Sequence, residues 1–130
     1  MVALPAEHPL AGREAIAMGE LADAPWVLVP ARVPSRLRDL TVRVAAAAGF
    51  TPRVAQEARE LDTLIALVSA GLGVTLVPAS AARVPRPGVV LRPLTGEALS
   101  FALVVLRRRG PAPPAVRSFL DVLLAVGRGT

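Results

Sequence analysis

The sequence predicts an α/β fold with an open, mostly parallel sheet. Three short segments, residues 26–29, 53–56 and 74–77, have the length of strands, and a proline borders each of them. The two intervals between these segments carry apolar residues at helical spacing, and each ends near a glycine. Strands that alternate with helices in this way form parallel crossover units and hence an α/β sheet.

The first strand–helix unit begins at Trp26. Residues Trp26 to Val29 are continuously apolar and end at Pro30, which is typical of a strand buried on both faces. Ser35 follows as the predicted N-cap of a helix, and Gly49 stands where a left-handed C-terminal cap belongs. The apolar face of this predicted helix comprises Leu37, Leu40, Thr41, Val44 and Ala48.

The second unit repeats this plan. Arg53 to Gln56 forms a short predicted strand after Pro52. Gly71 predicts a Schellman stop for the helix that follows, with Leu72 packing back onto it. The apolar face of that helix comprises Leu61, Leu64, Ile65, Val68 and Leu72. A third apolar strand, residues 74–77, is ended by Pro78.

The last third of the chain predicts two more strands and one helix. Val89 to Leu91 and Phe101 to Leu106 have strand character, and a turn over residues 95–97 separates them. A final helix is expected from Pro114 to about Gly127, since proline suits the first helical turn and glycine the end. Its predicted apolar face comprises Val116, Phe119, Leu120 and Leu123. The first twenty-five residues contain no convincing helix apart from a turn near residues 18–21.

Composition excludes several classes of protein. A chain of 130 residues has room for one compact domain, and 53% hydrophobic with 19% charged residues argues against disorder. There is no cysteine and only one histidine, His8, so disulfides, cysteine zinc sites and two-histidine metal motifs are excluded. We therefore predict no metal and no cofactor.

The sequence favours neither binding to nucleic acid nor insertion into a membrane. All fifteen basic residues are arginines, and they interleave with the acidic residues rather than cluster as nucleic-acid binding would require. The exclusive use of arginine fits the codon bias of a GC-rich genome, which explains the net charge of +5 without a charged partner. No run of about 18 apolar residues lacks a charge or a proline, which predicts no transmembrane helix. Residues 1–10 do not have the pattern of a signal peptide, so a cytoplasmic location is expected.

The sequence offers no convincing catalytic constellation. Serine nucleophiles would have only His8 as a base, and His8 is expected to be an exposed loop residue. Glu57, Glu60 and Asp62 stand at the predicted start of a helix, where acidic residues favour the helix dipole. The glycines of residues 71–73 come after a helix and before a strand, the reverse of a phosphate-binding loop.

The most suggestive segment is the loop over residues 30–36. It follows the carboxyl end of a predicted strand and leads into a helix, which is where ligands bind in open parallel sheets. Backbone N–H groups, the Ser35 hydroxyl and a nearby guanidinium would suit a carboxylate. An ordinary capped helix with solvated arginines explains the same residues equally well. The arginines at 107–109 could touch phosphates, but we favour a solvated strand end.

Several segments together resemble LysR-type transcriptional regulators. Residues 64–80, from Leu64 to Ser80, resemble the most recognisable stretch of the effector-binding region of that family. Residues 48–52 and the pair Glu57 and Glu60 match the usual approach to that helix. Residues 2–5, 8–11 and 21–26 resemble the family's crossing strand and the entry to its second subdomain, and residues 89–94 resemble the strand that crosses back. All of these matches occur in the family's order.

The resemblance implies a fold and a domain organisation. The effector region of this family has two Rossmann-like subdomains, each a three-layer arrangement, similar to type II periplasmic binding proteins, with a small-molecule site in the cleft between them. Residues 4–92 are then the second subdomain, and residues 93–130 are a returning strand and C-terminal helix of the first. The family's winged helix-turn-helix is absent from this sequence, so DNA binding is expected only through that domain.

The resemblance also implies site residues and partners. Residues Ala31, Arg32, Val33, Pro34 and Ser35 match the ligand-facing loop in position, with Arg32 and Ser35 as contacts and the others as walls. The opposite wall lies outside this sequence, so weak binding of a small-molecule effector is expected. The strand and helix of residues 93–130 would lack their usual packing partner, which predicts a homodimer or strand exchange.

These observations favour a non-enzymatic effector-sensing part of a transcription regulator, with a small carboxylate or other anion as ligand. A solute-binding or transport-associated domain of the same fold is the alternative, and the absence of a signal peptide argues against it. An enzyme of this fold is a third hypothesis, and the lack of a histidine and carboxylate constellation disfavours it.

Overall fold

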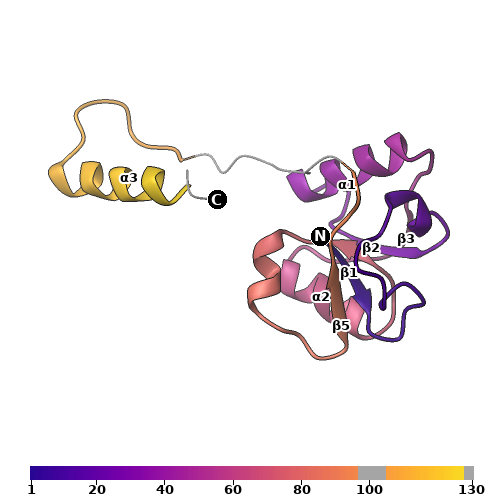
Figure 1. Ribbon diagram of the computed structural model, residues 1–130. Coiled ribbons are helices and arrows are strands. Elements are labelled where there is room, and N and C mark those ends of the chain that lie inside the picture. The colour runs from indigo at the N-terminus through magenta and orange to yellow at the C-terminus, as the bar shows by residue number, and fades with distance from the viewer. Residues whose placement is uncertain (97–104, 128–130) are drawn as a thin grey trace. The chain divides into compact units, whose positions relative to one another are not determined.

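The computed structural model describes residues 1–96 and 105–127. The chain divides into two compact units, Met1–Ser100 and Phe101–Thr130 (Figure 1). The strands are β1 (Val2–Pro5), β2 (Pro25–Leu28), β3 (Arg53–Glu57), β4 (Thr75–Leu76) and β5 (Val89–Arg92). The helices are η1 (Met18–Leu21), α1 (Arg36–Ala47), α2 (Leu61–Ser69), η2 (Ala79–Arg83) and α3 (Pro114–Gly127), where η denotes a 3₁₀ helix.

The α/β class is confirmed, and the strand pairing is mixed. Strands β2 and β3 pair in parallel, and a parallel bridge between Trp26 and Val74 connects β2 to the segment of β4, as the crossover units predict. The strands form two sheets, the parallel pair β2–β3 and a three-stranded sheet in the order β4-β1-β5, in which β1 is antiparallel to both of its neighbours. The expected mostly parallel pairing is therefore right for β2 and β3 and wrong for the three-stranded sheet, because β1 enters it outside any crossover unit.

Two clusters of buried side chains make up the core, one on each face of the sheet. Alternate residues of β1 and β2 point to opposite faces, so Val2 and Trp26 belong to one cluster while Ala3 and Val27 belong to the other. The first cluster includes Ala45 of α1, and the second includes Leu64, Ile65 and Val68 of α2. Helices thus cover both faces of the sheet, which confirms the predicted three-layer arrangement.

Both long helices of the first unit end as the glycine signals predict. Gly49 has a φ of +87°, its N–H donates to the carbonyl of Ala46, and the N–H of Phe50 donates to Ala45 at 3.0 Å. Gly71, with a φ of +78°, terminates α2 in the same Schellman pattern. The expected packing of Leu72 back onto α2 is wrong, because Leu72 is 42% exposed.

Four strands differ in their bounds from the prediction: β3 and β5 each run one residue further, to Glu57 and Arg92, and the other two are β2 and β4. Strand β2 starts at Pro25 rather than Trp26 and stops before Val29. Strand β4 contains only Thr75 and Leu76, because Val74 makes a single bridge to β2. The predicted turn near residues 18–21 is η1, and the first twenty-five residues form no α-helix.

The second unit contains α3, which confirms the predicted last helix with Pro114 in its first turn. No residue of α3 is buried. The predicted strand over residues 101–106 lies mainly outside the described residues, and Val105 and Leu106 themselves are not in a strand. Within residues 1–96 and 105–127, no helix is long and apolar enough to cross a membrane.

Candidate ligand-binding site

The loop after β2 carries the five residues that the sequence singles out. The N–H of Val33 donates to the carbonyl of Pro30 at 2.9 Å, and this turn brings the chain round to the start of α1. Ala31, Arg32 and Pro34 are exposed, whereas Val33 and Ser35 are half-buried. Val33 packs against the core cluster that includes residues of α2, so this side chain anchors the loop to the core. The exposed residues of the loop remain accessible to solvent.

Ser35 is the N-cap of α1. Its backbone is extended, with φ −150° and ψ 113°, and its Oγ accepts a hydrogen bond from the N–H of Arg38 at 3.2 Å. The Ser35 carbonyl accepts from Asp39 at 3.0 Å, which starts the helical ladder. A serine hydroxyl that accepts one bond still has its own proton to donate. Ser35 therefore orients the helix N-terminus and keeps one donor available to a ligand.

Replacing Ser35 with alanine is expected to destabilise the first unit by about 1 kcal/mol, because the N–H of Arg38 loses its partner. Aspartate at position 35 should restore most of that loss, since aspartate is an equally good N-cap. Urea unfolding followed by circular dichroism measures the difference. Equal stability of the wild type and the alanine variant would show that the cap is dispensable.

A polar pocket of about 570 Å³ opens beside this loop. Its lining comes from Pro30 and Arg32 of the loop and from Val54, Ala55, Gln56 and Glu57 of β3. The pocket thus lies where β2 and β3 end, at the carboxyl edge of the parallel pair. Of the five predicted residues, Arg32 alone lines this pocket.

The charges around the pocket leave Arg32 uncompensated. The guanidinium of Arg38 lies 3.6 Å from Oε1 of Glu57 and also donates to the carbonyl of Val29, so the Glu57 charge is balanced. Within the described residues, the Arg32 side chain makes no hydrogen bond or ion pair. A pocket with one unpaired guanidinium beside a helix N-terminus is suited to an anion.

Sequence reasoning missed the contribution of β3. Glu57 was predicted at the start of a helix, but it is the last residue of β3 and pairs with Arg38. The signal that could have found the lining residues 54–57 is topological. Carboxyl ends of adjacent parallel strands meet at one sheet edge, so the residues that end β3 had to lie beside the loop after β2.

The other sequence candidates lie away from this pocket. His8 is half-buried rather than exposed, its Nδ1 accepts the N–H of Leu10 at 3.2 Å, and burial lowers the pKa of His8. The predicted helix-start residue Asp62 pairs with Arg86 at 2.5 Å. Arg107, Arg108 and Arg109 are all exposed, in accord with the solvated interpretation. Across residues 1–96 and 105–127, no three His, Asp or Glu side chains form a metal-binding cluster.

Comparison with known proteins gives a family and a set of relatives. The family described as LysR substrate binding domain matches residues 1–128. The HTH-type transcriptional regulator AlsR of Bacillus subtilis is 33% identical over 122 residues, which cover 94% of this chain and 40% of AlsR. The regulator TtuA of Agrobacterium vitis is 42% identical over 94 residues, which cover 72% of this chain and 31% of TtuA. The chain therefore spans less than half the length of these two relatives.

Solved structures share the fold. The effector-binding domain of BenM with its effector benzoate matches 74% of this chain and 44% of that domain, with a TM-score of 0.64 and 27% identity. The effector-binding domain of QuiR in complex with shikimate matches 98% of this chain and 60% of that domain, with a TM-score of 0.74 and 22% identity. The family match over residues 1–128, together with these relatives, shows that the chain belongs to the LysR substrate-binding domain family, the effector-binding region of LysR-type transcriptional regulators.

Proposed function

We propose that this chain senses a small carboxylate for a LysR-type regulator, and that the carboxylate binds at Arg32. The observation that carries the proposal is the unpaired guanidinium of Arg32 in the polar pocket between the loop after β2 and the end of β3. The BenM domain, 27% identical to this chain, was solved with the carboxylate benzoate, which supports the same ligand class here.

Two groups would attract the carboxylate, and Ser35 would orient one of them. Arg32 supplies a fork of N–H donors with a full positive charge. The N-terminus of α1 adds partial positive charge, and within the described residues the N–H of Leu37 in its first turn has no hydrogen-bond partner. Ser35 does not line the pocket and acts as the N-cap that orients this helix terminus. The Arg38–Glu57 pair limits the site to one net positive charge, which favours a monocarboxylate over a dianion.

The ligand site on this chain is proposed to be half of a cleft. Residues 4–92 correspond to the second subdomain and residues 93–130 to the returning strand and helix of the first. The pocket at Arg32 is open to solvent on one side, so the opposing subdomain would complete its wall. Ligand closure of that cleft would favour one arrangement of the regulator's subunits over another, which is how sensing reaches the DNA-binding domain.

Membership of the family also bears on whether the chain is an enzyme and on how it relates to DNA. The curated relatives are transcriptional regulators rather than enzymes, and we propose that this chain likewise binds its ligand without turning it over. DNA contact belongs to a winged helix-turn-helix outside this sequence, and the regulator is proposed to act in the cytoplasm. The comparisons give no support to a solute-binding role in transport.

A thermal-shift experiment tests the role of Arg32. Benzoate should raise the Tm of the wild-type chain, because a ligand that binds only the folded state stabilises it, and the uncharged amide benzamide should not. Arg32→Ala should abolish the benzoate shift. Arg43→Ala removes an exposed arginine farther along α1, outside the pocket, and should leave the shift intact. An equal shift from benzamide, or a full shift in Arg32→Ala, would contradict the proposal.

We also propose that the chain forms a homodimer through α3. Phe119, Val122 and Val126 follow helical spacing on one face of α3 and are each more than 60% exposed, at 63%, 64% and 64%. A face of this kind in water favours association.

Light scattering should give twice the monomer mass for the wild type, and Val122→Asp should shift the mass toward the monomer because a charge would enter the apolar face. Arg117→Gln changes the charge by the same one unit on the opposite face of α3, without removing apolar surface, and should leave the dimer intact. A monomeric mass for the wild type at high protein concentration would contradict the proposed homodimer.

A further inference from the structure

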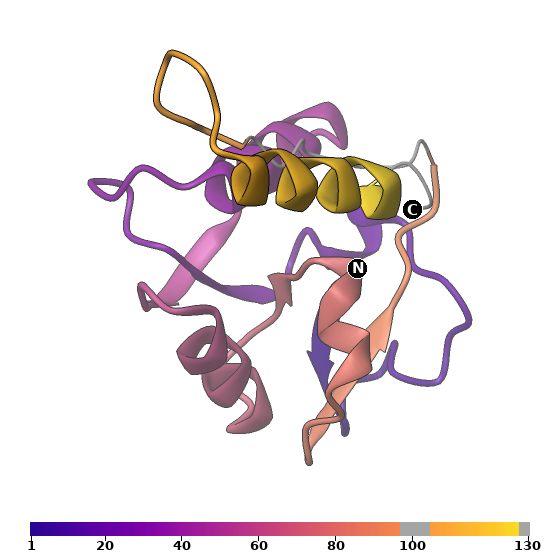
Figure 2. The ribbon, with the colours of Figure 1, turned by 90° about the vertical axis from the view of Figure 1, so that its left-hand side faces the viewer.

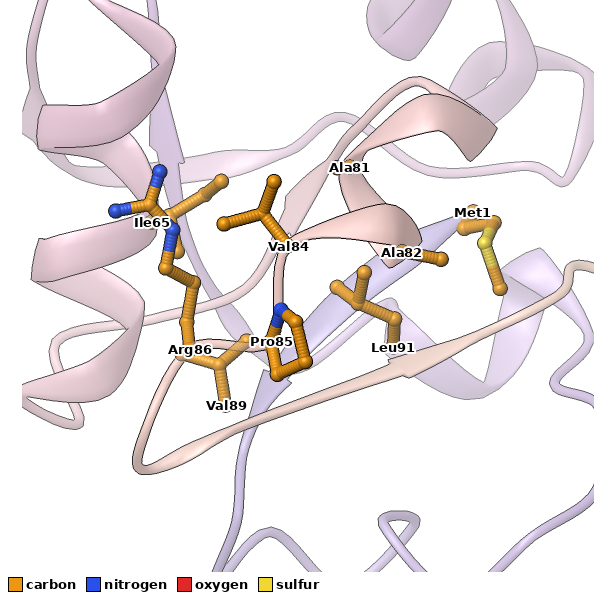
Figure 3. A pocket seen from close by; sticks show the side chains of 9 residues that line it. All are labelled: Met1, Ile65, Ala81, Ala82, Val84, Pro85, Arg86, Val89 and Leu91. Atoms are coloured by element: carbon orange, nitrogen blue, oxygen red, sulfur yellow. The ribbon is translucent and has the colours of Figure 1, made fainter.

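A second pocket lies on the other side of the first unit, between α2, η2 and β5. It has a volume of about 290 Å³. Figure 2 shows η2 beside β5, and Figure 3 shows the side chains between them. The lining residues are Met1, Ile65, Ala81, Ala82, Val84, Pro85, Arg86, Val89 and Leu91, of which Arg86 alone has a charged side chain. The N-terminal ammonium of Met1 donates to the carbonyl of Val77 at 3.0 Å. This pocket shares no residue with the pocket at Arg32.

Two hydrogen bonds join the loop between η2 and β5 to α2, and they hold this wall of the pocket in place. Near the start of α2, Asp62 accepts a hydrogen bond from Nη2 of Arg86 at 2.5 Å. At the last residue of α2, the Ser69 hydroxyl donates to the carbonyl of Pro87 at 2.8 Å. Ile65 lies in sequence between these ties and lines the pocket. A pocket with its walls held in this way requires little reorganisation to bind a ligand.

Gly88 shows how closely the loop approaches α2. Its φ is +76°, and a Cβ placed there would lie 2.8 Å from Oγ of Ser69. Only glycine accommodates both the left-handed backbone and the contact. Glycine at position 88 therefore permits the close contact between this loop and Ser69, the last residue of α2.

Arg86 gives the pocket one polar end. Its guanidinium lies toward Ile65, at the end away from Met1 (Figure 3). Asp62 takes a single bond from Nη2, and within the described residues the Nε and Nη1 atoms of Arg86 have no partner. Both members of the Arg86–Asp62 pair are substantially exposed, at 41% and 76%, so solvent weakens the pair and Arg86 can share its charge with another anion.

We propose that this pocket binds an amphipathic monocarboxylate, with its apolar body against η2 and β5 and its carboxylate at Arg86. A volume of about 290 Å³ corresponds to roughly ten water-sized groups, which matches a saturated chain of about eight carbons with its carboxylate. The apolar side chains of the eight other lining residues match the chain, and the free N–H groups of Arg86 match the carboxylate. This ligand site is independent of the site proposed at Arg32.

Isothermal titration of the full chain with octanoate, below its micellar concentration, tests the proposal. The titration is made in the Arg32→Ala background, which lacks the first carboxylate site, so that only this pocket is measured. Saturable one-to-one binding is expected, and octylamine, with the same chain and the opposite charge, should not bind. Adding Arg86→Gln should weaken octanoate binding about tenfold or more, since a charged hydrogen bond is lost.

A matched pair of variants in η2 tests the location. Ala82 is exposed and lines the pocket, so Ala82→Leu should fill the space and weaken octanoate binding about tenfold or more. Ala79 is also exposed and in η2 but does not line the pocket, so Ala79→Leu should bind as the wild type does. Circular dichroism checks that each variant folds. Unsaturable binding, equal affinity for octylamine, or full affinity in Ala82→Leu would overturn the proposal.

Discussion

Replacing Trp26 with alanine is expected to destabilise the first unit by about 3–5 kcal/mol. Trp26 is fully buried in β2, and its ring lies 6.2 Å from that of Phe50, which follows the end of α1. Its Nε1 donates to the carbonyl of Leu21 at 3.3 Å, so the same side chain fixes η1. Truncation would leave a cavity between these elements and remove one of the two hydrogen bonds to the Leu21 carbonyl, which would keep the bond from the N–H of Ala24 at 3.2 Å. A loss of this size is a large fraction of the stability of a small domain.

Urea unfolding followed by far-ultraviolet circular dichroism measures this loss, because the variant lacks the tryptophan fluorescence. Val42→Ala is the matched control, since Val42 is on α1 but 40% exposed, and it should cost well under 1 kcal/mol. A Trp26→Ala variant as stable as Val42→Ala would show that the core described around Trp26 is wrong.

Gly73→Ala is expected to destabilise the same unit by about 1–3 kcal/mol through overpacking. A Cβ at position 73 would lie 2.6 Å from the carbonyl oxygen of Pro25 and 3.0 Å from its carbonyl carbon. That oxygen cannot move away freely, because it accepts the N–H of Val74 at 2.8 Å in the bridge between β2 and the β4 segment. Gly73 is therefore needed for the close approach of these two segments.

Gly19→Ala is the control for this second prediction. Gly19 has no positive φ, and nothing lies within 4 Å of a Cβ built there. Its replacement should change stability by less than about 0.5 kcal/mol. Thermal unfolding of the two variants in parallel separates a steric clash from a general intolerance of alanine for glycine. Equal melting temperatures would contradict the steric argument.

Local signals predicted the helices well. Ser35 with Gly49 bounds α1, and Gly71 ends α2, because caps depend on residues within one turn of the helix end. Pro114 likewise marks the start of α3. These features need no knowledge of the rest of the chain.

Features that depend on distant residues were harder to predict. Nothing local in residues 2–5 reveals that β1 would lie antiparallel between β4 and β5, since pairing direction is decided by the whole topology. The exposure of Leu72 has a similar cause, because a Schellman stop specifies backbone hydrogen bonds and leaves the side chain's neighbours to tertiary packing.

The candidate site was predicted on one side only. The loop over residues 31–35 could be recognised from its position after a strand, whereas the wall formed by residues 54–57 depends on the register between β2 and β3. The pairing of Arg38 with Glu57, which leaves Arg32 as the unpaired charge of the pocket, could not be predicted from the sequence either. Arg38 and Glu57 are nineteen positions apart and meet because the first turn of α1, which follows β2, lies near the end of β3.

The proposed function rests on the binding of a small carboxylate at Arg32, beside the N-terminus of α1. Mapping amide chemical shifts of the isotopically labelled chain during a benzoate titration locates this binding residue by residue. Saturating shifts should be concentrated at residues 31–37 and 54–57, lost in Arg32→Ala and kept in Arg43→Ala. Shifts centred on residues 81–91, or no residue-specific shift at all, would show that benzoate does not bind at Arg32.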